Sequence, residues 1–148
     1  VDFKNTIIIM TSNLGSEYIL DNSKDKNELV MGELRKTFKP EFINRIDEII
    51  IFNSLSKNVV YEILDKIILD IQNRLIDKKI KLELTSRAKD FIINSAYDEV
   101  YGARPIKRFV SRNIETLLAK SIINEEIKYN SLVTIDVVNN EFIIKGND

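Results

Sequence analysis

The stretch Lys39-Pro-Glu-Phe-Ile-Asn-Arg-Ile-Asp-Glu-Ile-Ile-Ile-Phe52 decides how the first third of the chain is interpreted. Pro40 pushes the residue before it toward an extended backbone, so a preceding helix ends here. Residues 48–52 form an apolar run with several β-branched side chains, which predicts a buried strand. Arg45 stands just ahead of that strand. Two interpretations of Arg45 stay open from these residues alone. It forms an ion pair with Asp47 or Glu48, or it reaches outward to a ligand.

A second continuous apolar run, residues 6–10, also predicts a strand, of the kind found inside parallel sheets covered by helices. It is followed by Thr11, Ser12 and Asn13. Ligands of open α/β sheets bind beyond the carboxyl ends of strands, so these side chains stand where a polar substrate would be handled. The alternative is a simple strand-to-helix turn in which Ser12 or Asn13 caps the next helix.

The composition limits the chemistry that the chain can perform. It has 148 residues, a net charge of −1, and neither cysteine nor histidine. This length allows one ordinary domain or parts of two. The lack of both residue types excludes disulfides, most zinc sites and the usual catalytic triads, and we predict no metal site. The near-neutral charge argues against nucleic acid and anionic membranes as partners.

Targeting signals are not evident. The chain opens Val1-Asp2-Phe3-Lys4, which is not a signal peptide, and no apolar run approaches the ~20 residues of a membrane span. We therefore expect a protein of the cytoplasm or of an organelle interior, such as a plastid or mitochondrion, rather than a secreted or membrane protein.

The hydrophobic periodicity changes after Ser54. Before it we expect, besides the two strands, a short helical turn over 17–20, a polar loop over 21–27 and a helix over 29–38. After it, the pattern predicts about three helices and three strands. In order, these are a helix over 57–77 capped by Ser56, a strand over 80–84, a helix capped by Thr85, a loop over 97–102, a helix opening at 103–105, and strands over 132–138 and 141–145 joined by Asn139-Asn140.

These elements predict two parts of different class. Residues 1–54 contain two buried-type strands but lack the other strands that such a sheet requires. They are therefore interpreted as the C-terminal portion of a larger α/β domain. Residues 55–148 form a self-contained α+β small domain.

Three polar side chains stand at the ends of predicted elements: Asn13 after a strand, Arg45 before one, and Arg104 at a helix start behind Gly102. An amide can orient a water molecule because it both donates and accepts hydrogen bonds. Two arginines can hold a polyphosphate and neutralise the charge that develops during phosphoryl transfer. The combination suggests phosphate chemistry.

The motifs that carry these residues resemble the Clp branch of the AAA+ ATPases. They are Thr11-Ser12-Asn13, then residues 39–48 (KPEFINRIDE), then residues 101–108 (YGARPIKR). Over essentially the whole chain, the sequence is most similar to the C-terminal end of the second ATPase module of ClpB-type disaggregases.

This resemblance implies a role for each motif. Asn13 matches the sensor-1 asparagine, which helps to place the attacking water. Arg45 matches the arginine finger, which reaches the nucleotide of the neighbouring subunit. Arg104 matches the sensor-2 arginine, which contacts the phosphates in its own subunit, with Gly102 and Ala103 beside it at the nucleotide.

The resemblance also implies a parent protein that binds ATP or ADP with magnesium. That parent forms a homohexameric ring and threads unfolded or aggregated polypeptides through a pore, with co-chaperones among its partners. The chain itself has no G-x-x-x-x-G-K phosphate loop. We therefore expect the isolated chain neither to hydrolyse ATP nor to bind it tightly.

Several alternatives remain open. A ClpC- or ClpA-like unfoldase that feeds a peptidase would carry an Ile/Val/Leu-Gly-Phe/Leu tripeptide after sensor 1. The nearest match here is Met31-Gly32-Glu33, inside a predicted helix.

The isolated chain could also be a non-catalytic oligomerisation and lid module. Lys107, Arg108 and Arg112 are interpreted as a solvated face or subunit contact rather than a nucleic-acid patch. Tyr97 and Tyr101 either pack in the loop or shape the adenine side of the site.

Overall fold

The computed structural model describes residues 5–21 and 24–146. The chain divides into two compact units, Val1–Ser54 and Leu55–Asp148, which we describe separately. Val1–Lys4 and the Asn22-Ser23 part of the predicted polar loop lie outside the described residues.

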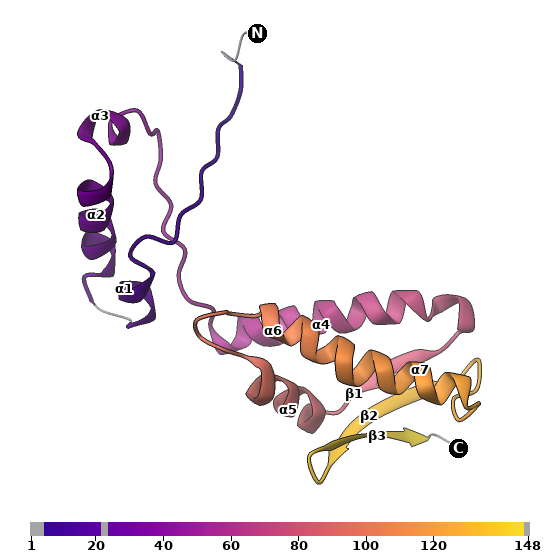
Figure 1. The fold of residues 1–148 in the computed structure, drawn as a ribbon. Helices are drawn as coiled ribbons and strands as arrows, with labels where there is room; N and C mark the ends of the chain where they lie inside the picture. Colours follow the sequence, from indigo (N-terminus) through magenta and orange to yellow (C-terminus); the bar gives the residue numbers. More distant parts are fainter. Residues whose placement is uncertain (1–4, 22–23, 147–148) are drawn as a thin grey trace. The chain divides into compact units, whose positions relative to one another are not determined.

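Three short helices make up the regular structure described in the first unit (Figure 1): α1 (Ser16–Leu20), α2 (Lys26–Thr37) and α3 (Pro40–Ile43). The predicted turn and helix are confirmed, although α2 begins at Lys26 and so takes the end of the expected loop. Lys39 is extended, with φ −66° and ψ 147°, as the following proline predicts. Gly15 has φ 71°, and a Cβ there would lie 3.0 Å from Val30 Cγ2. This glycine therefore lets the chain turn tightly against α2.

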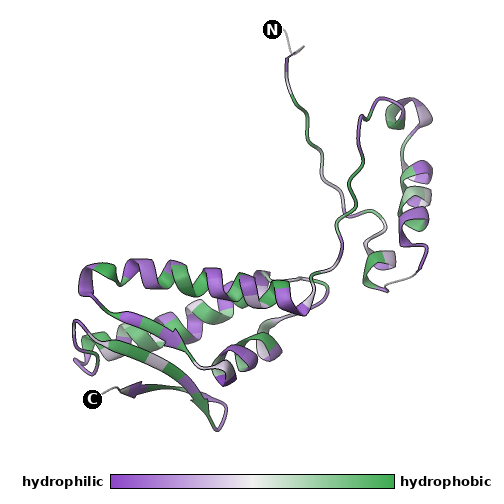
Figure 2. Cartoon of the chain, turned by 180° about the vertical axis from the view of Figure 1, so that it is seen from behind, coloured by the Kyte–Doolittle hydropathy of each residue, from purple (hydrophilic) through white to green (hydrophobic). Residues whose placement is uncertain are grey.

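The two predicted buried strands of the first unit are wrong for this structure. Residues 6–10 and 48–52 are not in strands, and Ile7 and Phe52 are 91% and 81% exposed. Figure 2 shows both apolar runs in green, along segments that are neither helix nor strand. An extended segment becomes a strand only when a neighbouring strand pairs its N–H and C=O groups. Among the described residues of this unit, neither run has such a partner.

The second unit is built on a three-stranded sheet in the order β1-β2-β3, from β1 (Lys81–Leu84), β2 (Leu132–Val138) and β3 (Glu141–Gly146). β1 runs parallel to β2, and β3 is antiparallel to β2 with Ile135 opposite Ile144. Asn139 and Asn140 both have positive φ, 51° and 64°, as a two-residue hairpin requires. The predicted strands and hairpin are confirmed.

Helices cover one face of this sheet: α4 (Lys57–Arg74), α5 (Ser86–Ala96), α6 (Arg104–Val110) and α7 (Thr116–Ile123) (Figure 1). A 3₁₀ turn, η1 (Ile76–Lys78), follows α4. The predicted caps are confirmed, since Ser56 Oγ accepts from Val59 N at 3.5 Å and Thr85 Oγ1 accepts from Ala88 N at 3.1 Å. The largest fully buried side chains of the core are Leu64, Ile80, Ile92, Ile106, Ile114, Ile135, Val60 and Val110.

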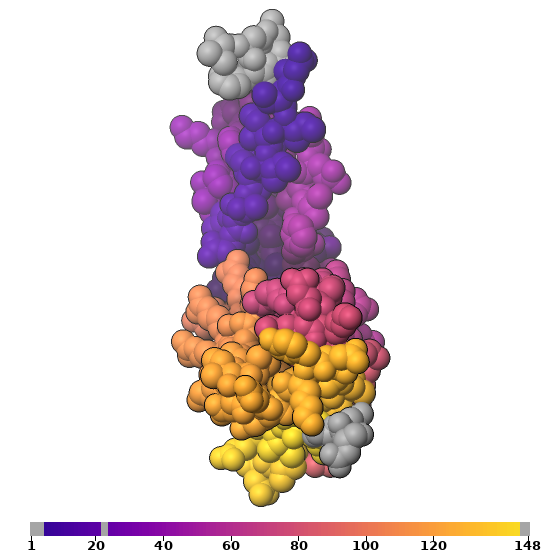
Figure 3. Space-filling model, turned by 90° about the vertical axis from the view of Figure 1, so that its right-hand side faces the viewer, coloured from indigo at the N-terminus to yellow at the C-terminus, as the bar shows by residue number. Residues whose placement is uncertain are grey.

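At one end of the second unit, the connection from α7 to β2 packs on η1 (Figure 3). Asn130 N donates to Lys78 O at 3.2 Å, and Lys78 Nζ donates to Tyr129 Oη at 3.1 Å. These bonds bring β2 beside β1, where Lys81 N donates to Ser131 O.

The helix that was expected to open at 103–105 is continuous but irregular. A π-helical turn, η2 (Ser111–Glu115), separates α6 from α7. Asn113 Nδ2 donates to the Phe109 carbonyl at 2.8 Å, so a side chain partly replaces the usual backbone donor there. The apolar spacing did not predict this turn.

Asp136 of β2 is a charged residue that is buried, with only 3% of its surface exposed. Its carboxylate accepts from Thr85 Oγ1 at 2.6 Å and from Val137 N at 2.9 Å, and it pairs with Lys145 Nζ at 2.5 Å. These donors, Lys145 foremost, hold the pKa of Asp136 well below its usual range. The buried carboxylate therefore ties the cap of α5 to the hairpin.

Candidate functional site

Asn13 lies in an exposed turn between the first apolar run and α1. Its backbone carbonyl accepts from Ser16 N at 3.2 Å, and Ser12 Oγ accepts from Leu14 N at 3.2 Å. The N-cap of α1 is Gly15, without a side-chain cap bond, so the helix-capping alternative for Ser12 or Asn13 is not what the structure shows. Within the described residues, the Asn13 amide keeps its donor and acceptor groups unengaged.

Arg45 lies in the turn directly after α3, where its backbone N–H bonds to the Phe42 carbonyl at 3.1 Å. The side chain is exposed. In the part of the chain that the structure describes, it forms no ion pair, so the alternative in which Arg45 pairs with Asp47 or Glu48 does not occur here. The Phe38 and Phe42 rings, with centroids 5.0 Å apart, hold the start of α3 against the end of α2.

Gly102, Ala103 and Arg104 form the junction between the 97–102 loop and α6. Gly102 has φ 63°, a left-handed conformation that glycine adopts without strain. The Ala103 carbonyl accepts the first bond of α6, from Ile106 N at 3.1 Å, and Pro105 fits the first turn. Arg104 is exposed, and no ion pair to it occurs among residues 5–21 and 24–146.

The structure brings together Gly102, Ala103 and Arg104 in the second unit, whereas Asn13 and Arg45 belong to the first. Asn13 lies in the turn before α1, Arg45 follows α3 and Arg104 begins α6, and in the described parts of the chain none of the three side chains has a hydrogen-bond or ion-pair partner. An exposed guanidinium without a carboxylate partner can bind phosphate bidentately, so both arginines fit a nucleotide.

Asp98 is a residue of this loop that the sequence analysis missed. Its carboxylate accepts from Val100 N at 2.8 Å and from Tyr101 N at 2.9 Å. Its carbonyl accepts from Gly102 N at 2.7 Å. The available signal was an aspartate at the start of a turn, a position where Asp and Asn bond to the backbone two residues on.

Of the two tyrosines of the loop, Tyr97 is the packing residue. It is partly buried, and its hydroxyl donates to the Leu55 carbonyl at 3.4 Å. Tyr101 is 67% exposed, beside the Gly102 junction.

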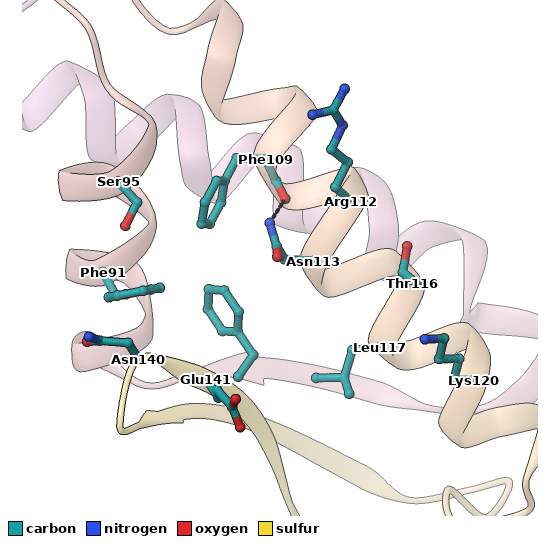
Figure 4. Close-up of a pocket in the computed structure, with 11 residues that line it drawn as sticks. Phe91, Ser95, Phe109, Arg112, Asn113, Thr116, Leu117, Lys120, Asn140 and Glu141 are labelled. Atoms are coloured by element: carbon teal, nitrogen blue, oxygen red, sulfur yellow. Dashed lines mark hydrogen bonds between the residues drawn. The ribbon is translucent and has the colours of Figure 1, made fainter.

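A shallow groove of about 480 Å³ lies elsewhere in the second unit, between α5, the α6–α7 helix and the β2–β3 hairpin (Figure 4). Its floor is formed by Phe91, Phe109 and Phe142, with ring centroids 5.4–6.5 Å apart. Arg112 and Lys120 line its helical wall, and Glu141 lines the hairpin wall. None of the predicted site residues borders this groove.

No cluster of three or more acidic residues that could hold a metal ion occurs among the described residues. Of the helices in the described ranges, none is both long and apolar enough to span a bilayer.

Two family models match the chain, one within each unit. Residues 55–135 match the family described as the C-terminal, D2-small domain of ClpB protein. Residues 1–49 match the AAA domain (Cdc48 subfamily).

Curated relatives are similar over 97% of this chain. The chaperone protein ClpB of Bacillus cereus (strain ATCC 10987) is 50% identical over 97% of this chain, and that of Clostridium perfringens is 49% identical. The chain spans only 17% of the length of these relatives.

Two solved structures are similar in fold as well as in sequence. The S. cerevisiae Hsp104–ADP complex superimposes with a TM-score of 0.80 at 36% identity, and covers 94% of this chain and 26% of its own. The extended conformation of the Hsp104–casein complex gives a TM-score of 0.75, also at 36% identity, over 93% of this chain and 25% of its own. On these matches, the chain belongs to the ClpB family of chaperones, and its residues 55–135 form a D2-small domain.

Proposed function

We propose that this chain is the C-terminal part of the second ATPase module of a ClpB-type protein-remodelling ATPase. In this proposal, residues 1–54 are the end of the AAA+ large subdomain and residues 55–148 are the small, or lid, domain. The parent assembles as a homohexamer, binds ATP or ADP with magnesium, and remodels unfolded or aggregated polypeptides with co-chaperones. Relatives solved with ADP and with casein support this class of ligand and client.

Each site residue then has one role. Asn13 orients the attacking water near the terminal phosphate. Arg45 reaches the nucleotide of the adjacent subunit, and Arg104 contacts the phosphates of its own subunit, with Gly102 and Ala103 next to them. A bound magnesium ion would neutralise phosphate charge beside these residues.

The observation that carries the proposal is that Asn13, Arg45 and Arg104 have no side-chain partner among the described residues. The local interactions that could have occupied them, a cap bond for Asn13 and an ion pair for Arg45, do not form in the described residues. An exposed arginine without a partner is available to a phosphate.

The decisive experiment substitutes Arg45 in the full-length parent. Arg45→Ala should leave nucleotide affinity nearly unchanged and lower turnover by on the order of 10³ or more, as loss of an arginine finger does in related hydrolases. Arg35→Ala is the matched control, because Arg35 is an exposed arginine of the same unit. Doping Arg45→Ala subunits into wild-type rings should depress activity more than proportionally. A strictly linear loss would contradict action across the subunit interface.

The second substitution, Arg104→Ala, should weaken nucleotide binding or uncouple it from remodelling. Arg108→Ala, on the same short helix and also exposed, serves as its control. Unchanged affinity together with unchanged coupling would remove the sensor-2 assignment.

The ClpC- or ClpA-like alternative is not favoured by the family match. In the structure, Met31-Gly32-Glu33 lies within α2, as expected, rather than in an exposed loop. Stable capture of the cognate peptidase by the full-length ring would overturn the preference.

As an isolated chain, the 148 residues act as a non-catalytic oligomerisation and lid module, because the sequence contains no phosphate loop. A phosphate-release assay on the isolated chain should show only background. We place the parent in the cytoplasm or an organelle interior.

A further inference from the structure

We propose that Asp98 is the positioning residue for Arg104: its hydrogen bonds fix the loop that presents Gly102, Ala103 and Arg104 to the nucleotide. This inference rests on the function proposed above for Arg104. It assigns a task to a side chain that touches neither phosphate nor Arg104 itself.

The first step is that one residue, Asp98, accepts several hydrogen bonds from the backbone of the loop. The Asp98 carboxylate oxygen Oδ1 accepts from both Val100 N and Tyr101 N, at 2.8 and 2.9 Å. The Asp98 carbonyl accepts from Gly102 N at 2.7 Å, which forms an isolated antiparallel bridge between Asp98 and Gly102. Three consecutive backbone N–H groups of the loop are therefore bonded to a single residue. A negatively charged acceptor makes such bonds stronger than a neutral one does.

The second step is that these bonds end where the functional residues begin. Gly102 receives the last of them in the left-handed conformation, φ 63°. Ala103 follows as the N-cap of α6 without a side-chain cap, and Arg104 is the first helical residue. The direction in which α6 starts, and with it the base of the Arg104 side chain, is thus set by the turn at Asp98.

The third step is that, among the described residues, Asp98 is the only acceptor for the backbone N–H groups of Val100 and Tyr101. Val100 and Tyr101 are 69% and 67% exposed, so burial of their side chains does not fix the loop. The Tyr97 hydroxyl anchors only the first residue of the loop, through its long bond to the Leu55 carbonyl. Without the Asp98 acceptor, the backbone N–H groups of Val100 and Tyr101 would donate to water instead, and the loop would sample other conformations.

The geometry also predicts which substitutions are tolerated. Asparagine presents a carbonyl oxygen at the same distance from the backbone and forms the same kind of turn. Alanine offers no acceptor, and glutamate places its carboxylate one methylene farther away. The neighbouring Glu99 is exposed and makes no hydrogen bond or ion pair with described residues, so Glu99→Ala removes the same charge without touching the turn.

The test has two readouts. In the 148-residue chain, amide hydrogen exchange at Val100 and Tyr101 should become roughly fivefold faster or more in Asp98→Ala, and stay near wild type in Asp98→Asn and Glu99→Ala. In the full-length parent, Asp98→Ala should weaken binding of a fluorescent ADP analogue by roughly tenfold. Small displacements of a positioned group have effects of at least that size. Asp98→Asn should retain most of the wild-type affinity for the ADP analogue.

A double-mutant cycle with Arg104→Ala tests whether Asp98 acts through Arg104. If it does, Asp98→Ala should add little to the loss already caused by Arg104→Ala. Full additivity of the two losses would overturn the inference, as would an Asp98→Asn variant as impaired as Asp98→Ala. If Arg104→Ala weakens binding while Asp98→Ala does not, the inference fails and the proposed function stands. If Arg104→Ala itself has no effect, the sensor assignment fails first.

Discussion

The two helix N-caps of the small domain should differ in their contribution to stability, although both are hydroxyl residues in the same position. Ser56 Oγ accepts from Val59 N at 3.5 Å, which is long for a hydrogen bond. Thr85 Oγ1 accepts from Ala88 N at 3.1 Å and also donates to the buried Asp136 carboxylate at 2.6 Å. Thr85 therefore loses two bonds on substitution by alanine, whereas Ser56 loses one weak bond.

The expected magnitudes follow from these contacts. Ser56→Ala should cost about 0.5 kcal/mol of unfolding free energy, the low end for an N-cap. Thr85→Ala removes a good cap, about 1 kcal/mol, and a hydrogen bond to a charged group, about 1.5–3 kcal/mol. We expect a total near 3 kcal/mol, which in a domain of this size lowers the melting temperature by roughly 12–24 °C, against roughly 2–4 °C for Ser56→Ala.

The assay is urea and thermal unfolding of the 148-residue chain, followed by far-ultraviolet circular dichroism at pH 7. Thr85→Ser is the matched variant, because it keeps the hydroxyl and should retain most of the stability. Equal losses for the two alanine variants, or a Thr85→Ser variant as unstable as Thr85→Ala, would refute the reasoning that the bond to Asp136 dominates.

Three further predictions concern the same domain. Because Lys145, Thr85 and Val137 N hold the pKa of Asp136 below its unfolded value, this carboxylate stabilises the fold fully at pH values above that unfolded value, and the stabilisation is lost as the pH falls toward the folded pKa. Asp136→Asn should flatten the dependence of the urea midpoint on pH between about 5 and 2, and a slope identical to wild type would exclude Asp136 as its source. Gly102→Ala should cost about 1–2 kcal/mol from the positive φ alone, since its Cβ would meet only Leu55 Cδ1 at 3.8 Å. Gly102→Asn should cost less, and an order reversed in urea titration would contradict this. Leu64→Ala should cost about 2–5 kcal/mol because Leu64 is fully buried, whereas Leu69→Ala, on the exposed side of the same helix, should stay within about 0.5 kcal/mol in the same titration.

Features that depend on neighbours in the chain were predictable in the small domain. The helix after Ser56, the cap at Thr85 and the Asn139-Asn140 hairpin all depend on contacts within a few residues. Periodicity and capping preferences report such contacts directly. The positions of Gly102 and Arg104 at a loop–helix junction were predictable for the same reason.

Features that depend on distant partners were not predictable in the same way. Residues 6–10 and 48–52 have the composition of buried strands, yet they are extended and largely exposed, because a strand exists only with a paired neighbour. The π-helical turn at 111–115 keeps the apolar spacing of an ordinary helix. Its register shift is stabilised by contacts such as the Asn113 amide on the Phe109 carbonyl.

Sequence alone was sufficient to identify the family motifs, the residues at their centres, and the helices and turns of the small domain, because these are encoded in short stretches. Only the tertiary structure showed that Asn13, Arg45 and Arg104 lack local partners among the described residues, that Asp136 is buried in a bonded cluster, and that the Asp98 carboxylate accepts hydrogen bonds within the turn before Gly102. Burial and hydrogen-bond partnership depend on which atoms meet when the folded chain excludes water, and residue order does not specify that directly.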